Sequence, residues 1–390
     1  MRLRPLLAAL ALTVPLLLPA SPVTASATAP ATASVAASVA AADDTAARYA
    51  APVVGAHRDN PTNPLAGRRW GVYRGPIEQA WEPYVQARGA QKELLAEIAL
   101  RPKAKWFVRN LGPRQLREKV REYVRVSQAG DPGTLVQLAL FGMQPWGAEM
   151  CRRVPTSGER NAYKAWVRAA VNGIGDAHTA VVLQPDLLIA RCSPDGGRAI
   201  RSLVAWASRA LSAAPHTSVY LDSGAWDWPN ASQGGAAAAA DLLLESGIRS
   251  ARGFALNATH YSPVGREIRR ARDLSRELAA RGVPGKRGVI STTSNGRGFT
   301  FGDYEPKASQ DNARTCTSVD DTAMCVMLGI PPGARVDAPG LGLDATARAA
   351  AGEYVDGWMW FGRPWLHDQA SPFVHQRAYD LARSWRLKPR

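Results

Sequence analysis

The sequence predicts an α/β fold in which a closed or nearly closed β/α barrel of seven or eight parallel strands is wrapped by helices. Three observations favour this class. Short apolar runs recur along the chain, and longer helical patterns separate them. After a low-complexity start, roughly 335 residues continue without another linker, which is a length that β/α barrels reach as one domain.

The expected strands are short runs rich in β-branched and aromatic residues. They are Trp70–Tyr73, Trp106–Val108, Leu135–Phe141, Ala180–Leu183, Ser218–Leu221, Gly253–Leu256, Gly288–Ser291 and Gly357–Phe361. The segments between them repeat apolar residues at helical spacing. The clearest of these helical segments are 78–100, 114–125, 160–174, 197–213 and 265–282. Strands that alternate with helices in this way predict a parallel sheet.

The first residues have the pattern of a secretory signal peptide. Two arginines stand among the first four residues, an apolar run extends from Pro5 to about Ala20, and small residues follow. We therefore expect a signal peptide over residues 1–26. Residues 27–55 are rich in Ala, Ser, Thr and Pro and predict a disordered tail. The protein is accordingly expected to be secreted and extracellular, with its folded part over residues 56–390.

The chain carries a net charge of +15, but its basic residues are interleaved with acids along helical stretches. This pattern is typical of solvated helix faces, whereas a nucleic-acid surface needs clustered cations. We expect no nucleic-acid partner, no membrane span and a monomer. Adhesion of a basic secreted protein to anionic polymers stays open as a third class of function.

Polar side chains follow several expected strands at the point where each strand ends. They are Asp186, Asp222, Asp368, Asn257, Tyr261 and Asn295. Because working residues of β/α barrels lie where strands end and loops begin, we expect these side chains to share one face. For each aspartate alone, a role in a turn or a helix cap is the alternative.

Tryptophans stand near the ends of the chain's expected strands as well. We select Trp70, Trp226, Trp228, Trp360 and Trp365 as candidate substrate contacts. An indole in a loop beside a carboxylate suits the C–H-rich face of a sugar ring, although buried packing is the alternative. Two carboxyl groups that flank a glycosidic bond can supply a general acid and a base or nucleophile. Together these residues predict a saccharide cleft.

With these motifs the chain resembles the family 6 glycoside hydrolases, the secreted cellulases that cut β-1,4-glucan with inversion. The resemblance begins near Asn63, and its blocks follow in the family's order. They are NPLAGRRWGVY, YKAWVRAAVNGIGDAHTAVVLQPDLL, VYLDSGAWDWP, GFALNATHY, ISTTSNGRG and VDGWMWFGRPWLHD. The resemblance implies a distorted barrel of about seven to eight strands that forms a catalytic domain over residues 56–390, with a tunnel or cleft at the strand ends.

The resemblance also implies roles for individual residues. The family's general acid falls on Asp186, and the proposed base, or the group that holds the attacking water, falls near Asp368. The strand-end acid matches Asp222, and an asparagine that contacts sugar matches Asn257. No cofactor is implied.

Four cysteines, Cys151, Cys192, Cys316 and Cys325, favour two disulfides in a secreted chain, and their number alone allows three pairings. The resemblance implies that Cys151 pairs with Cys192, which leaves a local Cys316–Cys325 bond. No cysteine or histidine spacing indicates a zinc site.

Several family positions differ in this chain. The acid expected directly before Cys151 is Met150, and Glu149 is only an approximate substitute. A lysine and a glutamate of the last block are replaced by Gly362 and Leu366. We therefore expect a secreted inverting glycoside hydrolase that acts on β-1,4-glucan or a related polysaccharide. The alternative is a saccharide-binding protein with weak or no activity on the same barrel.

Overall fold

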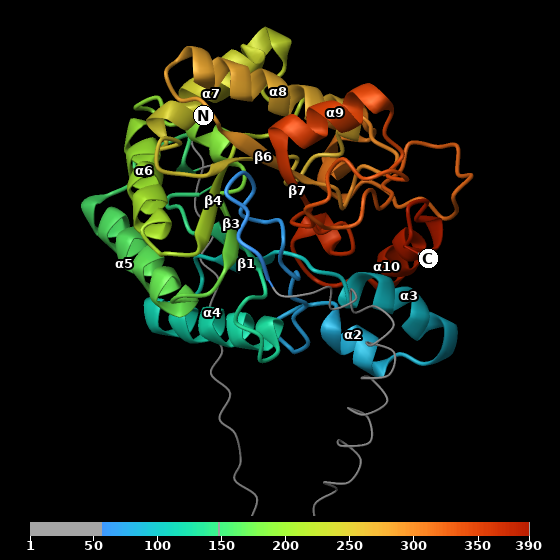
Figure 1. The fold of residues 1–390 in the computed structure, drawn as a ribbon. Helices are drawn as coiled ribbons and strands as arrows, with labels where there is room; N and C mark the ends of the chain where they lie inside the picture. The colour runs from blue at the N-terminus through green and yellow to red at the C-terminus, as the bar shows by residue number, and fades with distance from the viewer. Residues whose placement is uncertain (1–56, 147–148, 390) are drawn as a thin grey trace, which may run out of the picture. The chain divides into compact units, whose positions relative to one another are not determined.

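Seven parallel strands form one curled sheet (Figure 1). The computed structural model describes residues 57–146 and 149–389, so the predicted signal peptide and tail lie outside the described residues. The strands pair in chain order from β1 to β7, and every pair is parallel. They are β1 (Lys105–Val108), β2 (Val136–Phe141), β3 (Thr179–Leu183), β4 (Thr217–Asp222), β5 (Gly253–Leu256), β6 (Arg287–Ser291) and β7 (Val355–Met359). This confirms the predicted α/β barrel class.

Helices connect the strands and cover the sheet. They are α2 (Trp81–Gln86), α3 (Gly89–Ala99), α4 (Pro113–Gln128), α5 (Ser157–Ile174), α6 (Arg198–Ser212), α7 (Gly235–Glu245), α8 (Val264–Ala280), α9 (Ala345–Tyr354) and α10 (His375–Ser384). The sequence patterns predicted α2 to α6 and α8. They missed α7, α9 and α10, of which α7 and α9 are rich in alanine and lack a clear division into apolar and polar faces.

Side chains of each strand alternate between the helical layer and the barrel interior. In β3, Val181 and Leu183 pack in the cluster that includes the covering helices, whereas Ala180 and Val182 pack in the interior cluster with Tyr220. This alternation follows from the two-residue period of a strand. Both faces are apolar, as expected for a parallel sheet buried on both sides.

The barrel is not closed by a ladder between β1 and β7, among the residues that the structure describes. Two hydrogen bonds cross this seam. The Ala104 N–H donates to the Trp360 carbonyl at 2.8 Å, and the Trp106 indole N–H donates to the Phe361 carbonyl at 2.6 Å. The expected strand Trp70–Tyr73 is wrong, because only a single parallel bridge joins Trp70 to Leu135.

Outside the sheet, α2, α3 and α10 pack with the loops that follow β5 and β7 (Figure 1). Both expected disulfides are confirmed, Cys151–Cys192 and Cys316–Cys325, and the second lies in the long loop over residues 292–344. Within the described ranges, no helix is both long and apolar enough to cross a membrane.

Candidate active site

The acids predicted at strand ends lie at the carboxyl rim of the barrel. Asp222 is the last residue of β4, and Asp186 follows β3 after a two-residue link. Asp186 has a φ of 61°, and Asn257 after β5 has a φ of 66°. Left-handed backbone is costly for residues other than glycine and is found preferentially at functional sites. Asp186 and Asn257 therefore both have a left-handed backbone conformation just after a strand.

Asp186 is held in a largely protein-lined environment. Thr259 Oγ1 donates a hydrogen bond to its Oδ1 at 2.9 Å. Part of the residue reaches solvent, but its carboxyl group is packed among protein atoms, and this burial raises its pKa. The negative charge of Asp311 raises the pKa further, while the Thr259 hydrogen bond, His260 and Arg363 oppose the rise. Asp186 thus has the property that a general acid needs near neutral pH.

Asp222 lies beside Asp186 and is almost fully buried. Its Oδ1 accepts a hydrogen bond from the Gly224 N–H at 3.0 Å, and the Asp186 backbone N–H is a second donor near the carboxyl group. Burial and then the charge of Asp186 raise the pKa of Asp222 well above its ordinary value. The surroundings of Asp222 thus favour its neutral form more strongly than those of an exposed aspartate.

Asp368 lies on an exposed loop after β7, with 55% of its side chain accessible, and its Oδ2 is 3.2 Å from His367 Nδ1. The charge of Asp368 acts on Asp311, whose pKa is raised first by partial burial and then by Asp368. Asp311 also acts on Asp186. Sequence reasoning missed Asp311 because it lies in the long loop, where no periodic pattern marks it.

Glu149 is not brought to Asp186. It is exposed on the surface, where its Oε2 lies 2.8 Å from Arg153 Nη2, and it makes no hydrogen bond to Asp186. Met150, in the position where the family has an acid, is buried. The structure therefore places no carboxylate of this segment beside the candidate general acid.

Three of the aromatic residues predicted to contact substrate are fully buried. Tyr261, Trp360 and Trp365 belong to the cluster packed against α3 and α10, so they are core residues and not sugar platforms. The Tyr261 hydroxyl donates to the Gln310 carbonyl at 2.7 Å. Trp70 packs in the barrel interior and its indole donates to the Leu65 carbonyl at 3.1 Å, which also removes it from the rim.

The two predicted asparagines are buried parts of the loop framework. Asn257 Nδ2 donates to the Ser291 carbonyl at 3.0 Å, and its Oδ1 accepts from the Ser262 N–H. Asn295 is also buried. Trp226 and Trp228, by contrast, remain partly exposed after β4 and stay candidates for contact with a ligand.

Three aromatic rings lie in a row from β1 to the segment after β2, and none of them was selected from the sequence as a substrate contact. Trp106, Phe141 and Trp146 are neighbours, with ring centroids 5.4 Å and 4.1 Å apart along the row. The Arg363 guanidinium lies 3.9 Å from the Trp106 ring centroid. Burial lowers the pKa of Arg363 to about 10, and Asp186 opposes this shift. Arg363 thus brings a cation near the acid, next to the position where the family has lysine.

A second uncommon contact lies between the loops after β4 and β5. His260 Nδ1 is 2.8 Å from Asp227 Oδ1, and the Asp227 carboxylate is almost fully buried. Neither residue was selected from the sequence, although His260 directly follows Thr259 in the quoted block GFALNATHY. The signal was present in the motif, but the pairing joins two separate loops.

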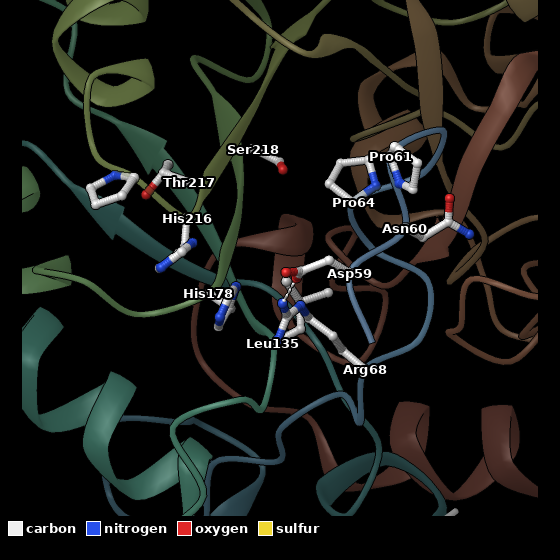
Figure 2. Close-up of a pocket in the computed structure, with 11 residues that line it drawn as sticks. Asp59, Asn60, Pro61, Pro64, Arg68, Leu135, His178, His216, Thr217 and Ser218 are labelled. Atoms are coloured by element: carbon white, nitrogen blue, oxygen red, sulfur yellow. Dashed lines mark hydrogen bonds and ion pairs between the residues drawn. The ribbon is translucent and has the colours of Figure 1, made fainter. Parts of the chain in front are cut away.

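A cavity of about 240 Å³ lies at the opposite, amino end of the strands (Figure 2). It is lined by residues that precede or begin β2 to β4, including His178 and His216, whose rings are stacked with centroids 4.2 Å apart. Figure 2 also shows Arg68 paired with Asp59 at its edge. The cavity is separate from the acids at the carboxyl rim. Among the described residues, no group of three or more potential ligands could hold a metal ion.

The chain is a parallel β/α barrel with buried or partly buried acids at the carboxyl ends of its strands. Its candidate site is therefore of the kind that β/α barrels build from the loops after their strands. The profile of Glycosyl hydrolases family 6 matches residues 71–306, and the chain belongs to this family. The recognition made from the sequence blocks is thereby confirmed.

Among its relatives, Endoglucanase A of Cellulomonas fimi is 29% identical over 231 residues, which are 58% of this chain and 47% of the relative. Endoglucanase 1 of Streptomyces halstedii is 27% identical over a region that covers 62% of this chain and 73% of that relative. The chain thus spans about half the length of the first of these relatives.

Among solved structures, the endoglucanase Cel6 of Mycobacterium tuberculosis, in complex with a methyl-cellobiosyl thio-cellobioside, superposes with a TM-score of 0.63 at 26% identity. The match covers 83% of this chain and 99% of that one. A family 6 enzyme of Orpinomyces has a TM-score of 0.60 at 18% identity, covers 83% and 98% of the two chains, and supports the fold alone.

Proposed function

We propose that the protein is a secreted, inverting glycoside hydrolase that acts on β-1,4-glucan or a related polysaccharide. The observation that carries the proposal is Asp186, an acid at the barrel rim whose pKa is raised by burial and which Thr259 orients. Membership of the family and the endoglucanase names of its relatives support the substrate class.

In the proposed reaction, protonated Asp186 gives its proton to the oxygen of the glycosidic bond as that bond breaks. A water molecule attacks the sugar carbon from the opposite face, and its proton passes to the carboxylate of Asp368, with Asp311 beside it. One water is consumed and two saccharide ends form, with inverted configuration at the attacked carbon. No cofactor takes part in these steps.

We further propose residues 1–26 as the signal peptide, 27–55 as a tail and 56–390 as the catalytic domain of a monomer. The two disulfides support export, because such bonds persist in oxidising compartments. Trp226 and Trp228 are the proposed sugar contacts that remain, since both are partly exposed after β4.

The experiment is to incubate the purified protein with soluble β-1,4-glucan and to measure new reducing ends, while proton NMR follows the first anomer formed. We expect reducing ends to accumulate and the α-anomer to appear first. Release of the β-anomer first would contradict inversion. Binding to insoluble glucan without release would favour the saccharide-binding alternative, for which Met150 and the distant Glu149 are the supporting observations.

A further inference from the structure

α5 and α6 lie side by side (Figure 1), and a groove of about 520 Å³ runs between them. α5 contributes Arg160 and Lys164 to its walls, and α6 contributes Arg198 and Arg209. Asp195 is the single acid among the described residues that line the groove. Its two carboxyl oxygens each accept a hydrogen bond at 2.8 Å from a backbone N–H at the start of α6. The walls of the groove are therefore positively charged.

Three of these cations, Lys164, Arg198 and Arg209, are not paired with acids of the protein. Within the described residues, none of them makes a side-chain hydrogen bond or an ion pair. Arg201 of α6 does not line the groove, and it forms an ion pair with Glu245 of α7. The α6 arginine outside the groove is thus neutralised, whereas the two inside it remain open to an external anion.

The charge pattern of α5 and α6 differs from that of a solvated helix face. α6 contains three arginines and no acid. The one acid of α5, Glu159, is held by Arg153 and by a capping box with Thr156. In α4, by contrast, the basic residues alternate with Glu118 and Glu122. The positive charge around the groove is therefore not balanced within the helices that form it.

The groove begins on the side of the carboxyl rim. Arg198 is the first residue of α6, and Arg160 is the fourth residue of α5. A cation at a helix N-terminus is unfavourable for the helix dipole, so helix stability does not explain these positions. Because each helix starts after the carboxyl end of a strand, this end of the groove lies toward the rim. Arg209 lies about 16 Å further along α6, so the charged path suits a polymer better than a single small anion.

An aromatic ring lies among these charges. Trp206 of α6 lines the groove, and its ring centroid is 5.8 Å from Lys164 Nζ and 5.1 Å from Arg168 Cζ. An indole surface suits the C–H-rich face of a sugar ring, and guanidinium groups pair with carboxylates through two parallel hydrogen bonds. A polymer that carries only phosphate groups has no apolar face for the indole. The groove therefore fits a chain of sugars that bear carboxylates.

We propose that the groove between α5 and α6 binds a linear acidic polysaccharide. Carboxylates of the chain pair with Arg160, Lys164, Arg198 and Arg209, and one of its sugar rings covers Trp206. The net charge of +15 adds a general attraction for such a chain. This site goes beyond the proposed hydrolysis, because it is separate from the acids after β3 and β4 and cleaves no bond. It attaches the protein to an anionic polymer whether or not that polymer is also a substrate.

The first test compares two soluble polymers with the same β-1,4 backbone. They are C6-oxidised cellulose, which is a polyglucuronate, and neutral hydroxyethyl cellulose. Calorimetry measures how tightly each binds the purified protein at low and at high ionic strength. We expect polyglucuronate to bind more tightly at low ionic strength and to lose affinity as salt is added, because exposed charges are screened. Equal affinities for the two polymers, or an affinity for polyglucuronate that salt leaves unchanged, would overturn the proposal.

Substitution of the groove cations locates the site. The groove variant is R160Q/K164Q/R198Q/R209Q, and its matched control on the exposed face of α4 is R114Q/R117Q/R121Q/R125Q, which loses the same charge. We expect the affinity for polyglucuronate to fall about 10-fold or more in the groove variant and less than about 3-fold in the control, because each exposed ion pair adds a modest amount. Equal losses would mean that net charge alone attracts the polymer, which contradicts a site in the groove.

The groove variant also separates this proposal from the hydrolase proposal. Its sugar release from neutral β-1,4-glucan should equal that of the wild-type protein, because the groove lies away from the rim acids. If polyglucuronate binds in the groove while no sugar is released from any glucan, the hydrolase proposal fails and the groove proposal stands. Loss of sugar release without any loss of polyglucuronate binding would contradict the groove proposal alone.

Should the groove variant fail to fold, acetylation of lysines in the wild-type protein provides a second measurement. Lys164 in the groove and Lys119 of α4 are both partly exposed, so Lys119 serves as the internal control. With polyglucuronate at about ten times its Kd, acetylation of Lys164 should slow about 10-fold, since about one molecule in eleven is then free. Mass spectrometry should show an unchanged rate at Lys119. Equal protection of both lysines would overturn the proposal, and so would protection of Lys164 by inorganic polyphosphate but not by polyglucuronate.

Discussion

Two buried aspartates at opposite ends of the barrel have opposite electrostatic surroundings. Asp356, the second residue of β7, lies 2.7 Å from Arg252 Nε and 2.8 Å from Arg287 Nε, and it accepts a hydrogen bond from the Tyr220 hydroxyl. Asp222, the last residue of β4, has two other acids, Asp186 and Glu267, for its charged neighbours.

The difference shows how one fold can separate a structural carboxylate from a reactive one. Buried charges are tolerated where cations pair with them, and breaking such a pair is strongly destabilising. Carboxyl groups that are buried together without cations shift their pKa upward, which is a property of functional sites. The amino end of the barrel therefore contributes stability, and the carboxyl rim contributes the proposed chemistry.

The largest effect is expected from the reactive side of this comparison. Asp186→Asn should lower sugar release from β-1,4-glucan by about 10²-fold to 10⁴-fold, because general acid catalysis contributes this much. The exposed Asp241→Asn serves as the matched control. Reducing-end assays give the rates, and an unchanged melting temperature shows that the fold is intact. Wild-type turnover by D186N would remove Asp186 from the mechanism.

On the structural side, Asp356→Asn should lower the free energy of unfolding by about 3 kcal/mol, because it leaves two arginines without their shared partner. Asp222→Asn should change it by less than about 1 kcal/mol or raise it, since it removes a buried group that has no cation. Urea unfolding of both variants at pH 7 measures the difference. Equal losses of unfolding free energy in the two variants would contradict the proposed difference between the amino and carboxyl ends of the barrel.

The buried Glu267 carboxyl group should make the free energy of unfolding depend on pH. Burial raises its pKa from 4.5 to about 8 in the folded protein. Between these values the folded state binds more protons than the unfolded state, so this group's contribution to stability falls as pH rises. Glu267→Gln should therefore gain about 4 kcal/mol over the wild-type protein at pH 8 and nothing at pH 4. Urea unfolding at both values is the measurement, and an equal gain at both would refute the shift.

The smallest effect is expected at Glu149, whose ion pair with Arg153 is solvent-exposed. Glu149→Gln should change the free energy of unfolding by less than about 0.5 kcal/mol, because exposed ion pairs contribute little. It should also leave the pH profile of sugar release unchanged. A displaced profile would mean that Glu149 acts on Asp186 after all.

The sequence predicted most of the strands and placed Asp186 and Asp222 at strand ends, because both features depend on local patterns, whereas Asp368 lies on an exposed loop beyond β7. Short apolar runs mark β3 and β4, and parallel pairing then places Asp186 and Asp222 at one end of the sheet. The exception was Trp70–Tyr73, where Trp70 packs against the barrel interior, Tyr73 packs with α4, and only one bridge forms.

Features that depend on long-range packing could not be predicted in the same way. Trp360 and Trp365 stand beside a strand end in the sequence, but α3 and α10 bury them. The contact of Asp227 with His260 and the approach of Asp311 to Asp186 each join separate loops. No periodicity within a single loop encodes such contacts.

The central claim is that Asp186 supplies a proton to the leaving group. It is tested most directly by comparing a substrate whose leaving group needs that proton with one whose leaving group does not. The rates of D186N and wild-type protein are compared on β-1,4-glucan and on dinitrophenyl β-cellobioside, whose leaving group departs without protonation. The account predicts a loss of about 10³-fold on glucan and a much smaller loss on the dinitrophenyl substrate. Equal losses on both substrates would contradict it.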